Sequence, residues 1–225
     1  MQLAKPCIDI GIYTNQRDAQ LHFWQTQVGL PFEELLKLGG GSQQHRHQLN
    51  GSVFKLNHSR NPIAAAPNTG YHELLIARPG LAAVEQLQDP DGNRVCLVPA
   101  GHLGISHIGI RMEVSSIAKF QHFYRDVLQI DQVSDTSFRW GTTLLLLTEN
   151  PQRRPTTGIQ GLGYRYITVQ VWQVDAEHEA FLARGGSAAR PPATLGSTAR
   201  ISFITDPDQN WIEISQRASL TGSLD

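Results

Sequence analysis

The chain has 225 residues, of which 40% are hydrophobic and 17% are charged, and its formal net charge is −1. This balance is typical of a globular protein and excludes a chain that is disordered over most of its length. The near-zero charge removes the electrostatic attraction to nucleic acid and to anionic membranes. A small-molecule substrate or another protein therefore remains as the expected partner.

The start of the chain and its cysteines indicate where the protein is expected to work. Residues 1–19 lack the apolar run and the cleavage site of a signal peptide. No segment approaches the roughly 18 apolar residues that a membrane span needs. Cys7 and Cys96 lie in separate apolar strands, which favours reduced, buried thiols. We therefore expect a cytoplasmic protein that does not bind membranes.

The first predicted unit is a strand, a helix and a short meander of strands. Residues 8–13, "IDIGIY", alternate and are rich in β-branched side chains, which predicts a strand. Asn15 then caps a helix that is expected to run to about Val28. Two alternating runs follow around Asn50-Gly51, the strongest short sequence signal for a tight hairpin.

The second predicted unit is a shortened one. It begins with the strand "GYHELLIA" at residues 70–77 and ends with the turn and strand "DPDGNRVCLV" at residues 89–98. The segment between these strands is too short to hold both a normal helix and another strand. We therefore interpret the second unit as truncated.

The third and fourth predicted units repeat this order in full. "GISHIGIRM", residues 104–112, predicts a strand, and a helix follows through about Val127. In the fourth unit the strand "GYRYITVQ", residues 163–170, precedes a helix from Asp175 to about Ala183. An alternating strand and the turn "DPDQN" then lead into a last strand, "WIEIS".

These similarities indicate an internal repeat. His22-Phe23-Trp24 corresponds to His122-Phe123-Tyr124, and each even-numbered unit contains one DPD-x-N turn. The sequence therefore predicts an α+β fold of four βαβββ-type modules, with the second module truncated. The two halves are expected to meet near residue 100, as an N-terminal domain (1–100, modules one and two) and a C-terminal domain (101–225, modules three and four).

This module pattern resembles the vicinal oxygen chelate superfamily, which includes glyoxalases, bleomycin resistance proteins and extradiol dioxygenases. The resemblance extends from about Cys7 to Gln216, and its most specific stretches are residues 104–112 and the two segments "GYRYITVQV" and "DPDQNWIEIS". It implies that paired modules form two curved, mixed-sheet half-barrels. It also implies that each half-barrel is a cup that holds a divalent metal and the oxygens of a substrate.

In this superfamily the metal ligands come from the first and last strands of the paired modules. In the C-terminal half the resemblance places His107 and Glu213 at two such positions, as an imidazole and a carboxylate ligand. Tyr166 occupies the third position, where a histidine is usual, and is expected to be either a ligand or a proton donor. Leu146 occupies the fourth and has no ligating atom.

The corresponding positions in the N-terminal half depart further from the pattern. They fall on Asp9, Lys55, Glu73 and Cys96. Lys55 is expected to be a charge partner of Glu73 or Asp9, and a hard, carboxylate-rich metal site does not favour a thiol. We therefore expect no ordinary metal centre in this half.

The predicted hairpin carries the candidate substrate-binding residues of the N-terminal half. If Asn50-Gly51 is a two-residue turn, His47 pairs with Phe54 and faces the helix. Arg46 and Lys55 then face the cup, where they are expected to bind a substrate carboxylate. The same segment also reads as a polar hairpin edge without chemistry, and its H-x-H pair has a spacing found in zinc and copper sites.

In the fourth module, Arg200 and Trp211 are expected on the cup side together with Glu213. Arg200 is a candidate for binding an anionic substrate, and Trp211 for a wall of the pocket. Asp206 is interpreted as structural, because its side chain can cap the amides of the DPDQN turn while Pro207 presets the backbone.

The leading hypothesis is a small-molecule enzyme that uses a divalent metal (Fe, Mn, Zn or Ni) in the C-terminal cup. His107 and Glu213 hold this metal, and the reaction is that of a dioxygenase, a lyase or an isomerase. The alternative is a metal-free binding or sequestering protein, like the resistance proteins of the superfamily. A homodimer in which modules pair between chains is a third possibility.

Overall fold

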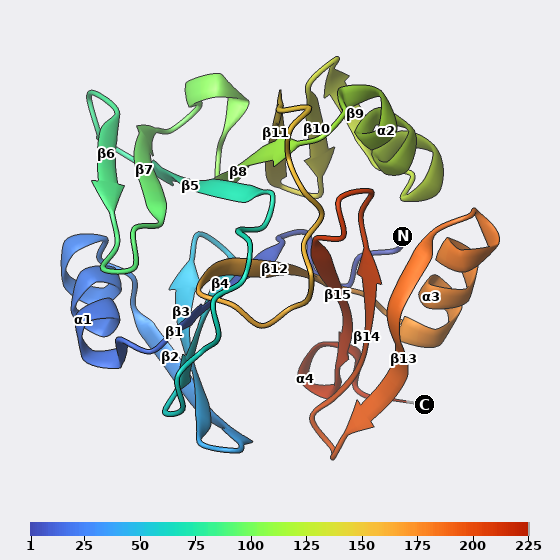
Figure 1. Ribbon diagram of the computed structural model, residues 1–225, viewed down its shortest axis with the longest axis horizontal. Helices are drawn as coiled ribbons and strands as arrows, with labels where there is room; N and C mark the ends of the chain where they lie inside the picture. The colour runs from blue at the N-terminus through green and yellow to red at the C-terminus, as the bar shows by residue number, and fades with distance from the viewer. Residues whose placement is uncertain (225) are drawn as a thin grey trace.

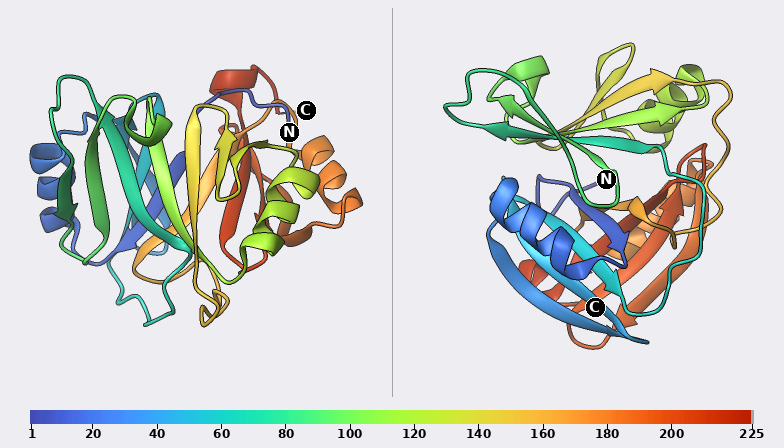
Figure 2. Two further views of the ribbon diagram at one scale, coloured as in Figure 1. Left: turned by 90° about the horizontal axis from the view of Figure 1, so that it is seen from above. Right: turned by 60° about the vertical axis from the view of Figure 1, so that its left-hand side comes forward.

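The computed structural model describes residues 1–224. It contains an eight-stranded and a seven-stranded mixed sheet, together with three longer helices that lie beside them (Figure 1). The eight-stranded sheet curls into a half-barrel (Figure 2). The α+β class and the four-module organisation predicted from the sequence are therefore confirmed.

The first module has one helix and four strands, in the order β1 (Asp9–Thr14), α1 (Arg17–His22), β2 (Phe32–Gly39), β3 (Ser42–Leu49) and β4 (Ser52–Ser59). The second module has three strands and, within the described residues, no helix between them, as its truncation predicted: β5 (Tyr71–Arg78), β6 (Glu85–Gln88) and β7 (Arg94–Pro99). A single 3-10 turn, His102–Gly104, leads out of it.

The third module repeats the first, in the order β8 (Ile108–Val114), α2 (Ile117–His122), β9 (Asp131–Ser134), β10 (Ser137–Trp140) and β11 (Thr143–Glu149). The fourth contains β12 (Gly163–Gln170), α3 (Val174–Ala183), β13 (Ser187–Leu195), β14 (Ala199–Thr205) and β15 (Trp211–Arg217), and the short α4 (Ala218–Thr221) follows it.

The modules pair in an order that differs from the one expected. The eight-stranded sheet has the order β13-β14-β15-β12-β1-β4-β3-β2 and joins modules one and four. The seven-stranded sheet has the order β6-β7-β5-β8-β11-β10-β9 and joins modules two and three. The expected C-terminal cup of modules three and four is therefore wrong. Residues 1–100 and residues 101–225 each contribute strands to both sheets.

A continuous apolar core connects the two sheets. Fully buried residues from both sheets belong to one cluster, among them Ile10 of β1, Leu74 of β5, Ile110 of β8 and Ile214 of β15. Side chains alternate between the two faces of a strand, so the neighbours of these core residues point to the opposite face. In the eight-stranded sheet this opposite face is the inside of the half-barrel.

The hairpin between β3 and β4 has the expected two-residue turn. Asn50 and Gly51 both have positive φ angles, 48° and 86°, as a type I′ turn requires. This turn sets the register of the two strands, so that Arg46 lies opposite Lys55 and His47 opposite Phe54. The predicted register is therefore confirmed.

Helices α1 and α2 both continue into one π-helical turn, over Phe23–Gln27 and Phe123–Val127. The two regions therefore cover nearly the lengths that the sequence predicted. The prediction that Asn15 caps the first helix is wrong, because no side chain caps α1. The Asn15 side chain instead forms hydrogen bonds with backbone atoms in residues 59–63. These bonds hold the loop after β4 in place.

The two DPD-x-N turns have the same internal structure. Asp89 accepts hydrogen bonds from the backbone of Asp91 and Asn93 and from the Asn93 amide. Asp206 accepts the corresponding bonds within its own turn. The structural interpretation of Asp206 agrees with this geometry.

Candidate functional site

The inner face of the eight-stranded half-barrel contains a cavity of about 190 Å³. Strands from modules one and four line it together with two loops. Its polar lining includes Gln44, Arg46, Lys55, Asn57, Gln170, Thr198, Glu213, Ser215 and Arg217, and its apolar lining includes Tyr13, Leu36, Leu38, Ile159, Tyr166, Leu195, Ala199, Ile201 and Phe203. The mixture of a polar floor and apolar walls is typical of a small-molecule site.

An ion pair lies on the floor of this cavity. The Lys55 ammonium donates hydrogen bonds to Thr168 Oγ1 at 2.6 Å and to Glu213 Oε2 at 3.0 Å. Thr168 in turn donates to the same carboxylate oxygen at 2.7 Å. Strand register brings the three together, because Thr168 lies directly opposite Glu213 across the β12–β15 pair. Lys55 is 3% exposed, so water screens this pair little.

The partner that the sequence suggested for Lys55 is therefore wrong. Asp9 lies opposite Thr168, but it pairs with Lys5 at 2.7 Å and accepts the backbone N–H of Val53. Glu73 lies in the other sheet and pairs with arginines there. The physical reason is the pairing of modules one and four, which places Glu213 of β15 within reach of Lys55 of β4.

A divalent metal does not fit this set of side chains. Lys55 occupies the last-strand position of module one, where the superfamily pattern calls for a metal ligand. An ammonium group has three donors and no lone pair, so it repels a metal ion and cannot coordinate it. Because it is bonded to Glu213, it also competes directly for the best candidate carboxylate.

His107 does not share a site with Glu213. It lies just before β8 of the seven-stranded sheet, where its carbonyl oxygen accepts hydrogen bonds from Ala77 N and Asn50 Nδ2. The three-residue ligand set His107, Glu213 and Tyr166 is therefore not assembled. Within the described residues no three histidine, cysteine, aspartate or glutamate side chains converge as a metal site would require.

Tyr166 does lie in the cavity, close to Lys55 and Glu213. The Lys55 ammonium is 5.4 Å from the centre of its ring. Burial raises its pKa well above the usual value of 10, so the phenol stays protonated. Its hydroxyl oxygen accepts hydrogen bonds from Gln44 and Asn57. These features favour a proton donor over a metal-bound phenolate.

Gly11 leaves the space that the Tyr166 ring occupies. A Cβ atom at Gly11 would lie 2.2 Å from the ring, far inside van der Waals contact. Gly11 pairs with both Tyr166 and Lys55, so it sits at the centre of the floor. The residue that looks least informative in "IDIGIY" thus makes room for the tyrosine.

Arg46 lies beside Lys55, as predicted, and is almost completely buried. Its Nη1 donates a hydrogen bond to Gln44 Oε1 at 3.2 Å. Its Nε makes no hydrogen bond and lies 3.6 Å from the carboxylate of Glu34. Arg217, at the end of β15, lies 3.8 Å from the same carboxylate.

The prediction that Arg200 faces the cup is wrong. Its neighbours Ala199 and Ile201 line the cavity, so Arg200 points to the other face of β14. There it forms a two-fold ion pair with Asp175 of α3. The error has a physical cause: Arg200 lies opposite Gln216, whose face differs from that of Glu213.

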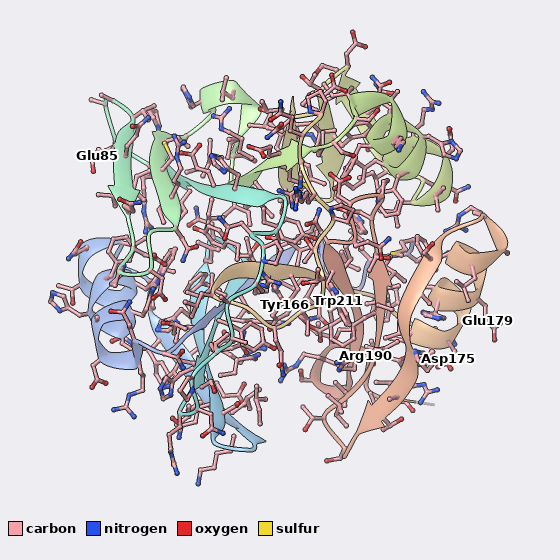
Figure 3. The ribbon with its side chains drawn as sticks, viewed as in Figure 1. Glu85, Tyr166, Asp175, Glu179, Arg190 and Trp211 are labelled. Carbon is pink, nitrogen blue, oxygen red and sulfur yellow. The ribbon has the colours of Figure 1, made fainter. Side chains whose placement is uncertain are left out.

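Trp211 forms part of an apolar cluster at the rim of the cavity. The cluster contains Tyr166 and Phe203, and the Trp211 and Phe203 rings lie 5.3 Å apart. The guanidinium of Arg190, on β13, lies over the Trp211 ring at 5.2 Å. Figure 3 shows Tyr166, Trp211 and Arg190 as neighbours on three strands of this sheet.

Several residues of the cavity were not predicted, chiefly Tyr13, Gln44, Asn57, Thr168, Arg190 and Arg217. Alternation along β1 and β15 would have placed Tyr13 and Arg217 on the same faces as Asp9 and Glu213. Their presence in one cavity depends on the pairing of modules one and four. No local signal in the sequence carries that pairing.

The inner face of the seven-stranded sheet differs in chemistry. It is mostly apolar, with Leu75, Cys96, Ile105 and Leu144 in one buried cluster. Burial raises the pKa of the Cys96 thiol, which disfavours a reactive thiolate. Glu73 is held by arginines on both neighbouring strands. Its buried cluster is therefore mainly apolar, unlike the polar floor of the other cup.

The comparisons with known proteins agree with this geometry. The family profile described as the glyoxalase/bleomycin resistance protein/dioxygenase superfamily matches residues 104–214. Curated protein sequences give no significant match.

No helix among residues 1–224 is long and apolar enough to cross a bilayer.

Two solved structures share the fold over most of the chain. Glyoxalase I from Zea mays superposes with a TM-score of 0.72 at 16% identity, covering 93% of this chain and 92% of that one. A putative dioxygenase from Bacillus subtilis superposes with a TM-score of 0.68 at 11% identity, covering 96% and 85%. At such identities the likeness shows the fold alone.

Proposed function

Because the chain belongs to the glyoxalase/bleomycin resistance protein/dioxygenase superfamily, we propose that its eight-stranded cup binds a small organic molecule without a divalent metal. The observation that carries this proposal is the Lys55–Thr168–Glu213 cluster on the cavity floor. Members of this superfamily typically use a divalent metal to hold the oxygens of their substrate. In this cup a fixed ammonium group supplies the positive charge instead.

The Lys55 ammonium is suited to hold a ligand oxygen. It has three N–H groups, and Thr168 and Glu213 accept two of them. The third has no acceptor among residues 1–224 and can donate to a carbonyl, hydroxyl or enolate oxygen of a bound molecule. The Tyr166 hydroxyl also has no acceptor for its proton among residues 1–224, so it offers a second donor to the same cavity.

A proton-transfer enzyme is the second candidate function, and Glu213 favours it. Only its Oε2 is used by Lys55 and Thr168, so Oε1 accepts no hydrogen bond from the described residues. A carboxylate beside an ammonium group can take a proton next to a carbonyl while the ammonium stabilises the resulting oxyanion. This arrangement supports an isomerase or lyase more than a dioxygenase, whose chemistry needs a redox-active metal.

Metal analysis of protein purified without chelator and without an affinity tag tests the proposal. We expect well under one Fe, Mn, Zn or Ni atom per chain. We also expect no change in melting temperature when any of these ions is added, because a metal that binds the folded state would raise it. Stoichiometric metal that disappears in a Glu213→Gln variant would overturn the proposal. The His107→Ala variant is the matched control, because His107 lies in the other sheet.

A further inference from the structure

Two arginines in the cup have no acidic side chain within hydrogen-bond distance among residues 1–224. The buried carboxylates Asp9 and Glu213 already pair with Lys5 and Lys55. Among residues 1–224 the ion-pair partner of both Arg46 and Arg217 is Glu34, at 3.6 and 3.8 Å. Both distances exceed that of a hydrogen bond, so Glu34 holds neither guanidinium firmly.

The surroundings of both arginines are unfavourable for a charged guanidinium group. Arg46 is 5% exposed, and its buried Nε has no hydrogen-bond partner. Burial, and then the nearby Arg46, lower the pKa of Arg217. Two guanidinium groups held close together and desolvated are unfavourable unless an anion joins them. Natural structures rarely leave such groups unpaired without a functional reason.

Glu34 is a weak occupant of the position between the two arginines. It lies on β2, the edge strand of the sheet, and its side chain is 45% exposed. Ion pairs that involve such an exposed carboxylate contribute little to stability. A ligand carboxylate can therefore replace Glu34 at small cost and form closer, forked contacts with the guanidinium groups.

The space around the two arginines fits a ligand with one acidic group. Arg46, Gln170 and Arg217 line both the 190 Å³ cavity and an adjoining cavity of about 320 Å³. The first cavity continues from the arginines to the apolar side chains of Leu36 and Phe203.

Building on the proposed function of the cup, we propose that Arg46 and Arg217 bind the carboxylate of an organic acid whose apolar or aromatic body lies in the cavity. When Glu34 is displaced, the two guanidinium groups lose their shared carboxylate, and one ligand carboxylate can contact both of them in its place. A single carboxylate suits this site better than a doubly charged phosphate, because Glu213 and Asp9 lie nearby.

Matched acid and amide probes test this inference. We would measure calorimetric binding of 3-phenylpropionate and of 3-phenylpropionamide, which differ only in the charge of the head group. We expect the acid to bind at least about 10-fold more tightly, the advantage of a charge-assisted contact. In Arg217→Met this advantage should disappear while the affinity for the amide is kept. Arg200→Met is the control, because Arg200 lies on the outer face with Asp175.

A Glu34→Gln variant gives an independent test with the opposite sign. Because it removes the competing carboxylate, we expect the acid to bind about 3- to 10-fold more tightly and the amide to be unaffected. Equal binding of acid and amide in the wild-type protein would overturn the arginine site but leave the proposed function of the cup intact. If neither probe binds, the arginine site is overturned, while the proposed function of the cup is decided separately by the metal analysis. A Glu34→Gln variant that weakens acid binding would also overturn the arginine site.

Discussion

Lys55 determines what the cup can hold, because a single side chain sets the sign of the charge on its floor. A carboxylate or imidazole at this position would offer lone pairs to a metal, next to Glu213 and close to Asp9. The ammonium offers only protons, and it neutralises Glu213 through a short contact. The chemistry open to the cup therefore changes with one residue, although the fold around it is the same.

We predict that Lys55→Glu creates a metal site. The variant places two carboxylates side by side on the buried floor, where their repulsion destabilises the protein until a hard cation joins them. Mn²⁺ at about 100 times its dissociation constant should raise the melting temperature by about 5 to 10 °C. Thermal unfolding with and without Mn²⁺ measures this change.

Lys55→Met is the matched control for that variant. It removes the ammonium without adding a ligand, so Mn²⁺ should leave its melting temperature unchanged. If Mn²⁺ stabilises Lys55→Met as much as Lys55→Glu, the ion binds elsewhere. The prediction is contradicted as well if Lys55→Glu folds normally and shows no response to Mn²⁺.

Local patterns in the sequence place single residues well only within one hairpin. The Asn50-Gly51 turn fixes the register of β3 and β4, and the cup-facing position of Arg46 and Lys55 followed from it. Arg200 shows the limit. Alternation sorts the residues of one strand onto two faces. It does not tell which of these faces lies on the same side of the sheet as a given face of the next strand, because that depends on the register between the two strands.

At the scale of elements, β3 and β4 present histidines to α1 on the face opposite the cup. His47 packs against Phe54 and contacts Gln25 of the helical region. Burial lowers its pKa to about 4, and it also lowers the pKa values of His45 and His58. None of the three has an acidic partner within ion-pair distance in the described structure. The packing of this helix therefore depends on neutral imidazoles.

We predict that His47 makes the protein less stable in mild acid. Its folded pKa of about 4 lies below the value of 6.5 in the unfolded chain. The unfolded state therefore takes up the proton first, and stability falls as the pH drops from about 6.5 to 4. On going from pH 7 to pH 4.5, the free energy of unfolding of the wild-type protein should fall by about 1 to 3 kcal/mol more than that of a His47→Gln variant. Urea denaturation at pH 7 and pH 4.5 checks this, and parallel losses in both proteins would contradict it.

The helices and turns could be predicted as elements because each depends on near neighbours. The three helical regions, the missing helix of the second module and the closed DPD-x-N turns all agree with the sequence pattern. The π-helical turns could not be predicted, since such single turns are rare and no residue type in these segments marks them.

At the scale of the whole molecule, the two DPD-x-N turns connect the sheets to each other. The first turn belongs to the seven-stranded sheet, and its Asp89 and Asp91 accept hydrogen bonds from Gln20 of α1. The second turn belongs to the eight-stranded sheet, and its Asp208 accepts hydrogen bonds from Ser115, just before α2. Each turn thus contacts the helical region of a module whose strands belong to the other sheet (Figure 1).

We predict that Asp208→Ala weakens this connection strongly. Asp208 is buried and accepts both the backbone N–H and the hydroxyl of Ser115, with Arg153 at 3.5 Å. Its loss leaves these donors unpaired and should lower the free energy of unfolding by about 2 to 4 kcal/mol. Chemical denaturation measures the difference.

Asp91→Ala in the first turn is the matched comparison. Asp91 is more exposed and accepts hydrogen bonds from Gln16 and Gln20 only, so the expected loss is about 0.5 to 1.5 kcal/mol. Equal losses in the two variants would show that the Ser115 contact contributes no more to the free energy of unfolding than the contacts of Asp91. Both variants remove a contact between the sheets, so the comparison measures how much more the buried Ser115 contact contributes than the exposed contacts of Asp91.

The pairing of the modules is what the sequence could not supply. All four modules have a first strand that can pair at its edge, and local periodicity is the same whichever partner it finds. The choice between neighbours and more distant modules depends on apolar contacts between residues far apart in the chain. The candidate site inherited this error, because His107 and Glu213 share a cup only if modules three and four do.

The pairing of modules one and four also affects the order in which the protein can mature on a ribosome. Residues 71–149 contain every strand of the seven-stranded sheet and emerge as one continuous stretch. The cup needs β12 and β15, so β1 waits with an unpaired edge until residues 163–217 have been made. During that interval a nascent chain exposes the open edge of β1. The edge of β1 is therefore expected to need protection during synthesis, and the cup becomes complete only after residue 217 has been made.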